Sequence, residues 1–262
     1  MPVRLPRRAE MKVAYKHDPP LSEIGRIMTQ IFARELVVRN AIPKVIYSST
    51  SFASIQTAAD IQSFIGAFKM WFFRKRRIIH LCPTSFENVN TTFIRGLYGE
   101  EIEDEQILSF LRKECGSICV DPSLASDRQA APFWLTQKEM LQLKYHINES
   151  YIPQKVEGED LNSIASSMKR LINTFSQRTG LESYVFCYCN FGFPSERETI
   201  SVLVVMDSLA VSMLMNIVSG AETKYDQSEK QLRKEAEIAF PATSSIIFAP
   251  NDSVSTQLFD IP

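Results

Sequence analysis

The fold is decided by residues 181–218, LESYVFCYCNFGFPSERETISVLVVMDSLAVSMLMNIV. This stretch holds the two clearest strand candidates, Ser183–Phe191 and Thr199–Met206, which are rich in Val, Ile, Tyr and Phe. The polar link between them contains Gly192 and Pro194, which predicts a hairpin. The second strand has almost no polar alternation, so we expect both of its faces to be buried in the protein.

Upstream of this stretch, short apolar strands alternate with helical patterns. Such alternation is typical of a mostly parallel sheet that is covered by helices. We therefore predict an α/β fold with a mixed, mainly parallel sheet, helices on both faces, and an antiparallel hairpin (183–206) in the C-terminal half. The other predicted strands are Lys44–Ser48, Ile78–Cys82 and Ser117–Asp121, and the main predicted helices are 22–39, 57–77, 104–115, 136–148 and 160–180. Capping boxes of Thr57 with Asp60 and of Thr136 with Glu139 open two of these helices, and Asp160 caps the last.

The predicted domain organisation has three parts. Residues 1–20 form a basic, proline-punctuated N-terminal arm with a short strand at Met11–Tyr15, and residues 251–262 form an irregular C-terminal tail. Between them, residues 21–250 form a single α/β domain, with a candidate sub-boundary near 150–160, where the sequence reads as a linker.

Composition excludes several classes of protein. The net charge is −1 and the pI is near 6.3, so nothing global points to nucleic acid or to an anionic membrane. The 5 cysteines have no framework spacing, which favours a reducing compartment over a disulfide scaffold. The N-terminus lacks the apolar core of a secretory signal, and no apolar run reaches the length of a membrane span. We therefore expect a soluble intracellular protein, cytoplasmic or nuclear, with no membrane partner.

Polar residues follow several predicted strands at their carboxyl ends, where ligands bind in open α/β sheets. Asp121 ends one strand, Asp207 ends another, and the hydroxyl run Ser48–Ser51 follows a third. If these strands are parallel neighbours, paired carboxylates at one rim could hold Mg²⁺ or act as acid and base. The alternative is structural, because Asp207 stands where a helix N-cap belongs and Asp121 precedes a proline turn.

The most concentrated charge is a basic run at the end of a predicted helix. It comprises Lys69, Arg74, Lys75, Arg76 and Arg77, with aromatic residues beside it. Cations next to aromatic side chains are typical of surfaces that bind single-stranded nucleic acid, and the run also resembles a nuclear-import sequence. The structural alternative is a helix C-terminus whose cations suit the helix dipole while its aromatic residues pack inward.

Metal and cofactor motifs are missing from the sequence. The histidines and cysteines lie in apolar strands or polar surroundings without zinc-ligand spacing, so we predict no metal site and no cofactor. Glycine is scarce (9 residues), and the sequence has no P-loop, dinucleotide-binding fingerprint, G-x-S-x-G elbow or kinase signature. These absences lower the expectation of an enzyme, and no motif set identifies a family.

Three functional classes remain. The first is a non-catalytic interaction or assembly protein, as a subunit of a complex or a virus-encoded structural component, with a protein partner or self-association. The second is a nucleic-acid-binding protein that uses the basic run. The third is a divergent metal-dependent enzyme with Asp121 and Asp207 at strand ends. We favour the first, because the motifs of the common enzyme families are missing.

Overall fold

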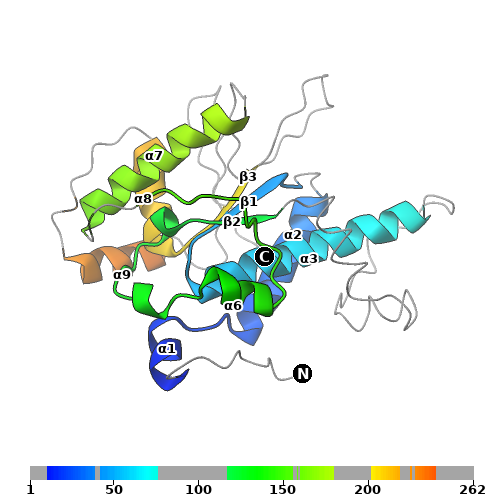
Figure 1. The fold of residues 1–262 in the computed structure, drawn as a ribbon, viewed down its shortest axis with the longest axis horizontal. Coiled ribbons are helices and arrows are strands. Elements are labelled where there is room, and N and C mark those ends of the chain that lie inside the picture. Colours follow the sequence, from blue (N-terminus) through cyan, green and yellow to red (C-terminus); the bar gives the residue numbers. More distant parts are fainter. Residues whose placement is uncertain are drawn as a thin grey trace.

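A computed structural model describes residues 11–38, 42–75, 117–155, 158, 160–179, 202–218, 225 and 228–239, as Figure 1 shows. The side chains of Met11, 67–75, 172–179 and Val218 lie outside that description. These residues form an α/β fold, as predicted. The helices are α1 (Met11–His17), α2 (Glu23–Val38), α3 (Phe52–Lys75), α6 (Gln137–Gln142), α7 (Leu161–Thr179), α8 (Ser208–Val218) and α9 (Glu229–Ala239), with short 3₁₀ turns at Pro122–Leu124 and Ala131–Phe133.

The described strands form one parallel sheet in the order β2-β1-β3, with β1 at Val45–Ser48, β2 at Ile118–Val120 and β3 at Val202–Val205. The chain leaves β1 to form β2 on one side and later forms β3 on the other side. This reversal of direction is the topological arrangement at which open α/β sheets place their ligands, beyond the carboxyl ends of the strands.

One face of the sheet is covered by α2, α3 and α6. Ile46, Ile118 and Leu203 are register partners on this face, and each is buried against these helices. Phe52 and Ile55 of α3 are fully buried in the same cluster, and α3 contacts all three strands. The apolar side of a long helix therefore fixes the position of the loop that joins β1 to α3.

The opposite face is covered by α7, α8 and α9, which lie together on the other side of the strands in Figure 1. Tyr47, Cys119 and Val202 contribute to this second core, with Met168 of α7 and Met213 of α8 fully buried among them. Alternate residues along β1 thus enter opposite cores, as the two-residue period of a strand requires. The predicted burial of β3 on both faces is confirmed by this arrangement.

Two local predictions are wrong. Residues Met11–Tyr15 belong to helix α1 and not to a strand, because Ala14 is buried and Tyr15 stacks on Phe52 of α3. Helix α3 begins at Phe52 and not at a capping box on Thr57, whose hydroxyl donates to a backbone carbonyl inside the helix. In both places tertiary packing overrides the local sequence pattern.

Other local predictions are confirmed. The capping box of Thr136 and Glu139 opens α6, and Asp160 accepts a hydrogen bond from the backbone N–H of Ser163 at the start of α7. The predicted strand Ile78–Cys82, the helix 104–115 and the first hairpin strand Ser183–Phe191 lie outside the described residues.

The domain boundaries stay predictions, but the segment read as a linker has contacts with the domain. The hydroxyl of Tyr151 and the backbone N–H of Gln154 both donate to Asp121. In the described ranges no helix has the length and apolar character needed to cross a membrane. The compartment stays a prediction.

Candidate functional site at the carboxyl edge of the sheet

Three loops leave the sheet at its carboxyl edge. Residues 48–51 follow β1, residues 121–134 follow β2, and Asp207 follows β3 by two positions. Because the three strands are parallel neighbours, the structure brings the predicted hydroxyl run and both predicted aspartates to the same edge. Backbone hydrogen bonds join the loops there, from Asp121 N to Ser48 O and from Ser49 N to Val205 O, each 2.9 Å long.

Asp121 is fully buried, and both of its carboxylate oxygens accept hydrogen bonds from the protein. Oδ1 accepts from the backbone N–H of Ser123 at 2.8 Å and from its hydroxyl at 2.5 Å. Oδ2 accepts from the Tyr151 hydroxyl at 2.5 Å and from the backbone N–H of Gln154 at 3.3 Å. Burial, and then the hydrogen bond to Asp121, raise the pKa of Tyr151, so the phenol stays a donor at neutral pH.

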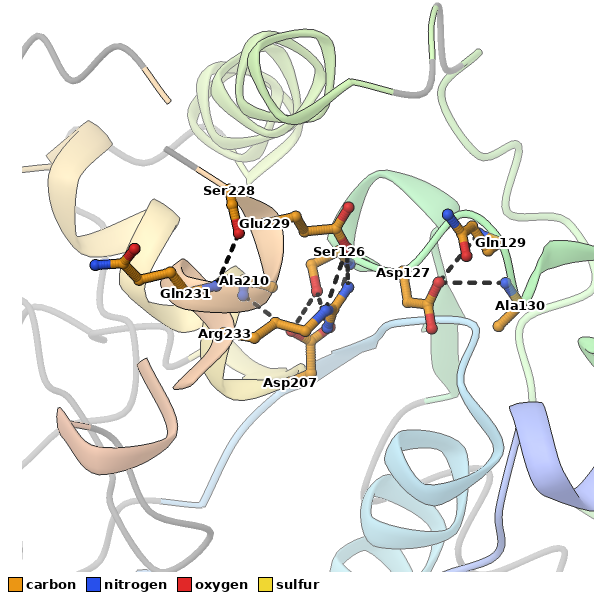
Figure 2. A network of polar contacts seen from close by, with 10 residues as sticks. All are labelled: Ser126, Asp127, Gln129, Ala130, Asp207, Ala210, Ser228, Glu229, Gln231 and Arg233. Carbon is orange, nitrogen blue, oxygen red and sulfur yellow. Dashed lines mark hydrogen bonds and ion pairs between the residues drawn. The ribbon is translucent and has the colours of Figure 1, made fainter. Parts of the chain in front are cut away.

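Asp207 is the N-cap of α8 and also fixes the loop after β2 (Figure 2). Its Oδ1 accepts from the backbone N–H of Ala210 at 3.0 Å and from the Ser126 hydroxyl at 2.6 Å, and its Oδ2 accepts from Ser126 N at 3.2 Å. Ser126 Oγ in turn accepts a hydrogen bond from Nη1 of Arg233 on α9 at 3.1 Å. The Nε and Nη2 atoms of the same guanidinium donate to the carboxylate of Glu229. Three segments of the chain, the loop after β2, the start of α8 and α9, therefore meet at Ser126.

The two aspartates act as structural acceptors, one on each side of β1. Asp121 caps the 3₁₀ turn after β2 and Asp207 caps α8, on opposite sides of β1. Every carboxylate oxygen of the two residues accepts at least one internal hydrogen bond. Among the residues that the structure describes, no three His, Cys, Asp or Glu side chains gather in a group able to hold a metal ion.

The loop between β1 and α3 is lined with hydroxyls. Ser49 Oγ lies 3.3 Å from Ser51 Oγ, and Ser51 Oγ donates to Ser54 Oγ at 2.8 Å. The carboxylate of Asp18, which is 2% exposed, accepts from the first backbone N–H of α3, that of Phe52, at 2.6 Å. An internal carboxylate therefore already satisfies the start of this helix.

Two polar groups at this edge are shielded from solvent and have no hydrogen-bond partner within the described part of the chain. They are the hydroxyl of Thr50, in a residue that is 7% exposed, and the Nε and Nη2 atoms of Arg128. Buried donors are almost always paired in native proteins, so unpaired ones need an explanation. Thr50 follows β1 and Arg128 lies in the loop after β2, so both belong to the edge where ligands bind in this class of fold.

Among the described residues, the guanidinium of Arg128 forms no ion pair with a carboxylate. Burial lowers the pKa of its guanidinium, and the negative charge of Asp121 partly opposes that shift. The guanidinium carbon lies 5.9 Å from the centre of the Trp134 ring, within the range of a cation–π contact. Beside Trp134, Phe133 stacks on the exposed ring of His17, with centroids 4.8 Å apart. An arginine stays protonated even with a lowered pKa, so the site retains a positive charge.

The basic run is only partly covered by the structure. Lys69, Arg74 and Lys75 lie within the bounds of α3, but their side chains are outside the described set, as are Arg76 and Arg77 altogether.

Sequence reasoning missed Arg128, Thr50, Ser126 and Arg233. Thr50 stood inside the predicted hydroxyl run, but nothing distinguished it from its neighbours. The signal for Arg128 and Ser126 was the length of the irregular loop after β2, because long loops in compact domains are usually functional. Arg233 gave no signal, since an arginine four residues after a glutamate on a charged helix is an ordinary surface pair.

Comparison with known proteins finds solved structures of similar shape, with 14 matching chains, one of which is that of an enzyme. It is the crystal structure of the ecdysone phosphate phosphatase from Bombix mori in complex with tungstate, with 13% sequence identity and a TM-score of 0.49. The match covers 87% of this chain and 67% of that one. No protein-family model matches the sequence, and no curated protein does.

The solved structure is that of an enzyme, and this contradicts our prediction of a non-catalytic interaction or assembly protein. We withdraw that prediction, together with the structural and RNA-binding roles that accompanied it. A likeness this distant transfers neither a substrate nor a catalytic residue, so the function has to be argued from the site itself.

Proposed function

We propose that the carboxyl edge of the sheet binds a small molecule through an oxyanion, such as a phosphate or phosphate monoester, with Arg128 as its main anchor. The proposal is carried by the unpaired, solvent-shielded Nε and Nη2 atoms of Arg128. A guanidinium presents its N–H groups in a fork that matches phosphate and carboxylate oxygens. A ligand oxyanion would supply the acceptors that the described protein groups do not.

The energetics of Arg128 support a functional role. A charged group that is removed from water without a hydrogen-bonded partner lowers the stability of the folded state. The negative charge of Asp121 attracts the guanidinium, but the carboxylate oxygens of Asp121 accept hydrogen bonds from Ser123, Tyr151 and Gln154 instead. Such locally unfavourable arrangements persist where function requires them, and an anionic ligand would relieve this one.

The hydroxyls of the loop after β1, at the same edge of the sheet, suit the same ligand. Thr50 carries an unpaired hydroxyl, and the hydroxyl hydrogens of the neighbouring serines can rotate toward an acceptor. Arginine and hydroxyl donors around a bound phosphate are also what phosphoryl transfer needs, because the charge of its transition state is spread over the phosphoryl oxygens. Phosphate-ester chemistry is therefore the reaction class that we assign to this edge.

The proposal is tested by titrating the full chain with inorganic phosphate in a calorimeter, at constant ionic strength in a phosphate-free buffer. We expect the wild type to bind and Arg128→Met to lose at least about tenfold in affinity, as expected when one partner of a buried charge pair is removed. Arg170→Met on α7 is the matched control and should bind like the wild type. A wild type that does not bind, or an Arg128→Met variant that binds equally well, would overturn the proposal.

A turnover assay then separates recognition from catalysis. p-Nitrophenyl phosphate is offered to the wild type and to Arg128→Met, and release of the nitrophenolate is followed. Hydrolysis that Arg128→Met abolishes would support phosphate-ester chemistry at this edge. Phosphate binding without hydrolysis would reject that reaction class and leave the binding site in place.

A further inference from the structure

Helix α9 carries an arginine that reaches back to the carboxyl edge of the sheet. Most of the helix is exposed, and Ala236 is its buried residue. The side chain of Arg233 is only 29% exposed, and its Nη1 donates to the hydroxyl of Ser126, which lies 107 positions earlier in the chain (Figure 2). An arginine on a charged helix ordinarily pairs within its own helix, as Arg233 does with Glu229. The additional contact with Ser126 joins α9 to the loop after β2.

Ser126 holds this contact in one direction. Arginine only donates hydrogen bonds and a carboxylate only accepts them, so the hydroxyl of Ser126 accepts from Arg233 and donates to Asp207. The backbone N–H of Ser126 donates to the second oxygen of Asp207, and the residue is 2% exposed. Ser126 is therefore fixed both from α9 and from the start of α8.

Arg128 follows Ser126 by two residues, and the turn after it is also fixed. The carboxylate of Asp127 accepts from the backbone N–H groups of the two residues after Arg128, at 3.0 and 3.3 Å. The Nε and Nη2 atoms of Arg128 have no hydrogen-bond partner in the described part of the chain. The direction of the guanidinium is therefore set by the backbone on both sides of it and by its contact with the Trp134 ring.

We propose that Arg233 is a positioning residue for Arg128, so that the contact of α9 with the loop after β2 sets the affinity of the oxyanion site. The inference rests on the proposed function, because it takes Arg128 as the anchor of the ligand. A guanidinium binds an oxyanion tightly when its N–H groups are held in place beforehand, since the ligand otherwise has to order them. Without Arg233, Ser126 is held from α8 alone, and the loop that carries Arg128 opens more readily.

Phosphate titration of the full chain tests the effect on affinity. Arg233→Met should weaken binding about fivefold or more, the size of a typical coupling between two sites. Lys234→Met is the matched control, because it removes the same charge from an exposed position of the same helix and should bind like the wild type. Equal phosphate affinities in Arg233→Met and Lys234→Met would overturn the inference.

The fluorescence of Trp134 tests the positioning without any ligand. The sequence has 2 tryptophans, so Trp71→Phe leaves Trp134, beside Arg128, as the reporter. In this background Arg233→Met should shift the emission to longer wavelength and increase its quenching by acrylamide, because the loosened loop exposes the ring to water, and Lys234→Met should change neither. Identical spectra and quenching in the two variants would overturn the inference even if the wild type binds phosphate.

The two measurements separate this inference from the proposed function. A wild type that binds no phosphate, together with the expected change in Trp134 fluorescence, would reject the oxyanion site and support the control of the loop by Arg233. A wild type that binds phosphate, with affinity and fluorescence both insensitive to Arg233→Met, would leave the oxyanion site in place and reject the role of Arg233.

Discussion

Asp121 and Arg128 lie in the same loop after β2, and they differ in how their shielded polar atoms are hydrogen-bonded. Asp121 is fully buried, whereas Arg128 is half-buried with two shielded nitrogens. The carboxylate of Asp121 accepts four hydrogen bonds from Ser123, Tyr151 and Gln154. The guanidinium of Arg128 leaves Nε and Nη2 without any acceptor in the described part of the chain. A buried charge that is fully bonded stabilises its own surroundings, whereas one left unbonded is a cost to the folded state.

On our proposal, this difference separates the structural part of the site from the part that binds. The aspartates, which sequence position marked as candidate catalytic groups, hold the loops in place. The arginine, which no motif marked, is the group that we propose binds the ligand. The two groups should therefore respond to mutation in opposite directions.

Asp121→Ala gives the largest expected effect. The substitution leaves four donors without their acceptor, of which the two on Ser123 are buried, and we expect the free energy of unfolding to fall by about 3–5 kcal/mol. Asp127→Ala is the control, because its half-buried carboxylate accepts only the backbone N–H groups of Gln129 and Ala130, and a loss of about 1 kcal/mol is expected there. Urea denaturation of both variants measures the free energy of unfolding. An equal decrease in the two variants would show that Asp121 stabilises the fold no more than Asp127 does.

Tyr151→Phe removes one of those four hydrogen bonds, and we expect a loss of about 1–2 kcal/mol at pH 8. The raised pKa of Tyr151 adds a dependence on pH. A folded-state pKa above the unfolded value of about 10 means that this contribution is complete below pH 10 and declines as the pH rises further. The difference in stability between wild type and variant should therefore be constant below pH 10 and should narrow as the pH rises above 10, as followed by urea titration. A gap that widens with pH would contradict the hydrogen bond to Asp121.

The fold and the framework of the site follow from the sequence, but the binding group does not. Strand β1 and the capping box at Thr136 were predicted because apolar runs and caps are local patterns with local causes. The placement of Asp121 and Asp207 at one edge followed from parallel strands ending together. Arg128 could not be found in this way, because whether a loop arginine meets a carboxylate depends on side chains brought together only by the fold.

The same limit explains the failure at Met11–Tyr15. The segment alternates polar and apolar residues and so resembles a strand, but packing of Ala14 and Tyr15 against α3 selects a helix. Asp18, directly after this helix, then reaches the first backbone N–H of α3. These contacts join segments that are distant in sequence, and no local pattern encodes them.

Arg128→Met should act in the opposite direction to Asp121→Ala. Methionine retains much of the apolar stem and removes the unpaired charge, so we expect the unfolding free energy in phosphate-free buffer to rise by about 1 kcal/mol. Added phosphate should stabilise the wild type and leave this variant unchanged, because only a ligand that binds the folded state shifts its stability. Thermal unfolding with and without phosphate measures both effects. A large loss of stability would instead make Arg128 a structural residue like Asp121.

The smallest effect concerns Thr50, and a second threonine provides its control. Thr50 and Thr29 are each 7% exposed, but the hydroxyl of Thr29 donates to Gly25 O at 2.8 Å, whereas that of Thr50 has no partner in the described residues. Valine has nearly the shape of threonine, so each exchange tests the hydroxyl alone. Thr29→Val should cost about 1 kcal/mol, the net value of one hydrogen bond, while Thr50→Val should cost nothing or stabilise the protein slightly.

The same pair of variants separates stability from binding. If the Thr50 hydroxyl contacts the oxyanion, Thr50→Val weakens phosphate binding in the calorimeter, Thr50→Ser retains it, and Thr29→Val has no effect on it. Equal destabilisation by the two valine exchanges, with phosphate affinity unchanged in both, would mean that the Thr50 hydroxyl finds a partner within the protein. The contrast between bonded and unbonded groups at this edge would then rest on Arg128 alone.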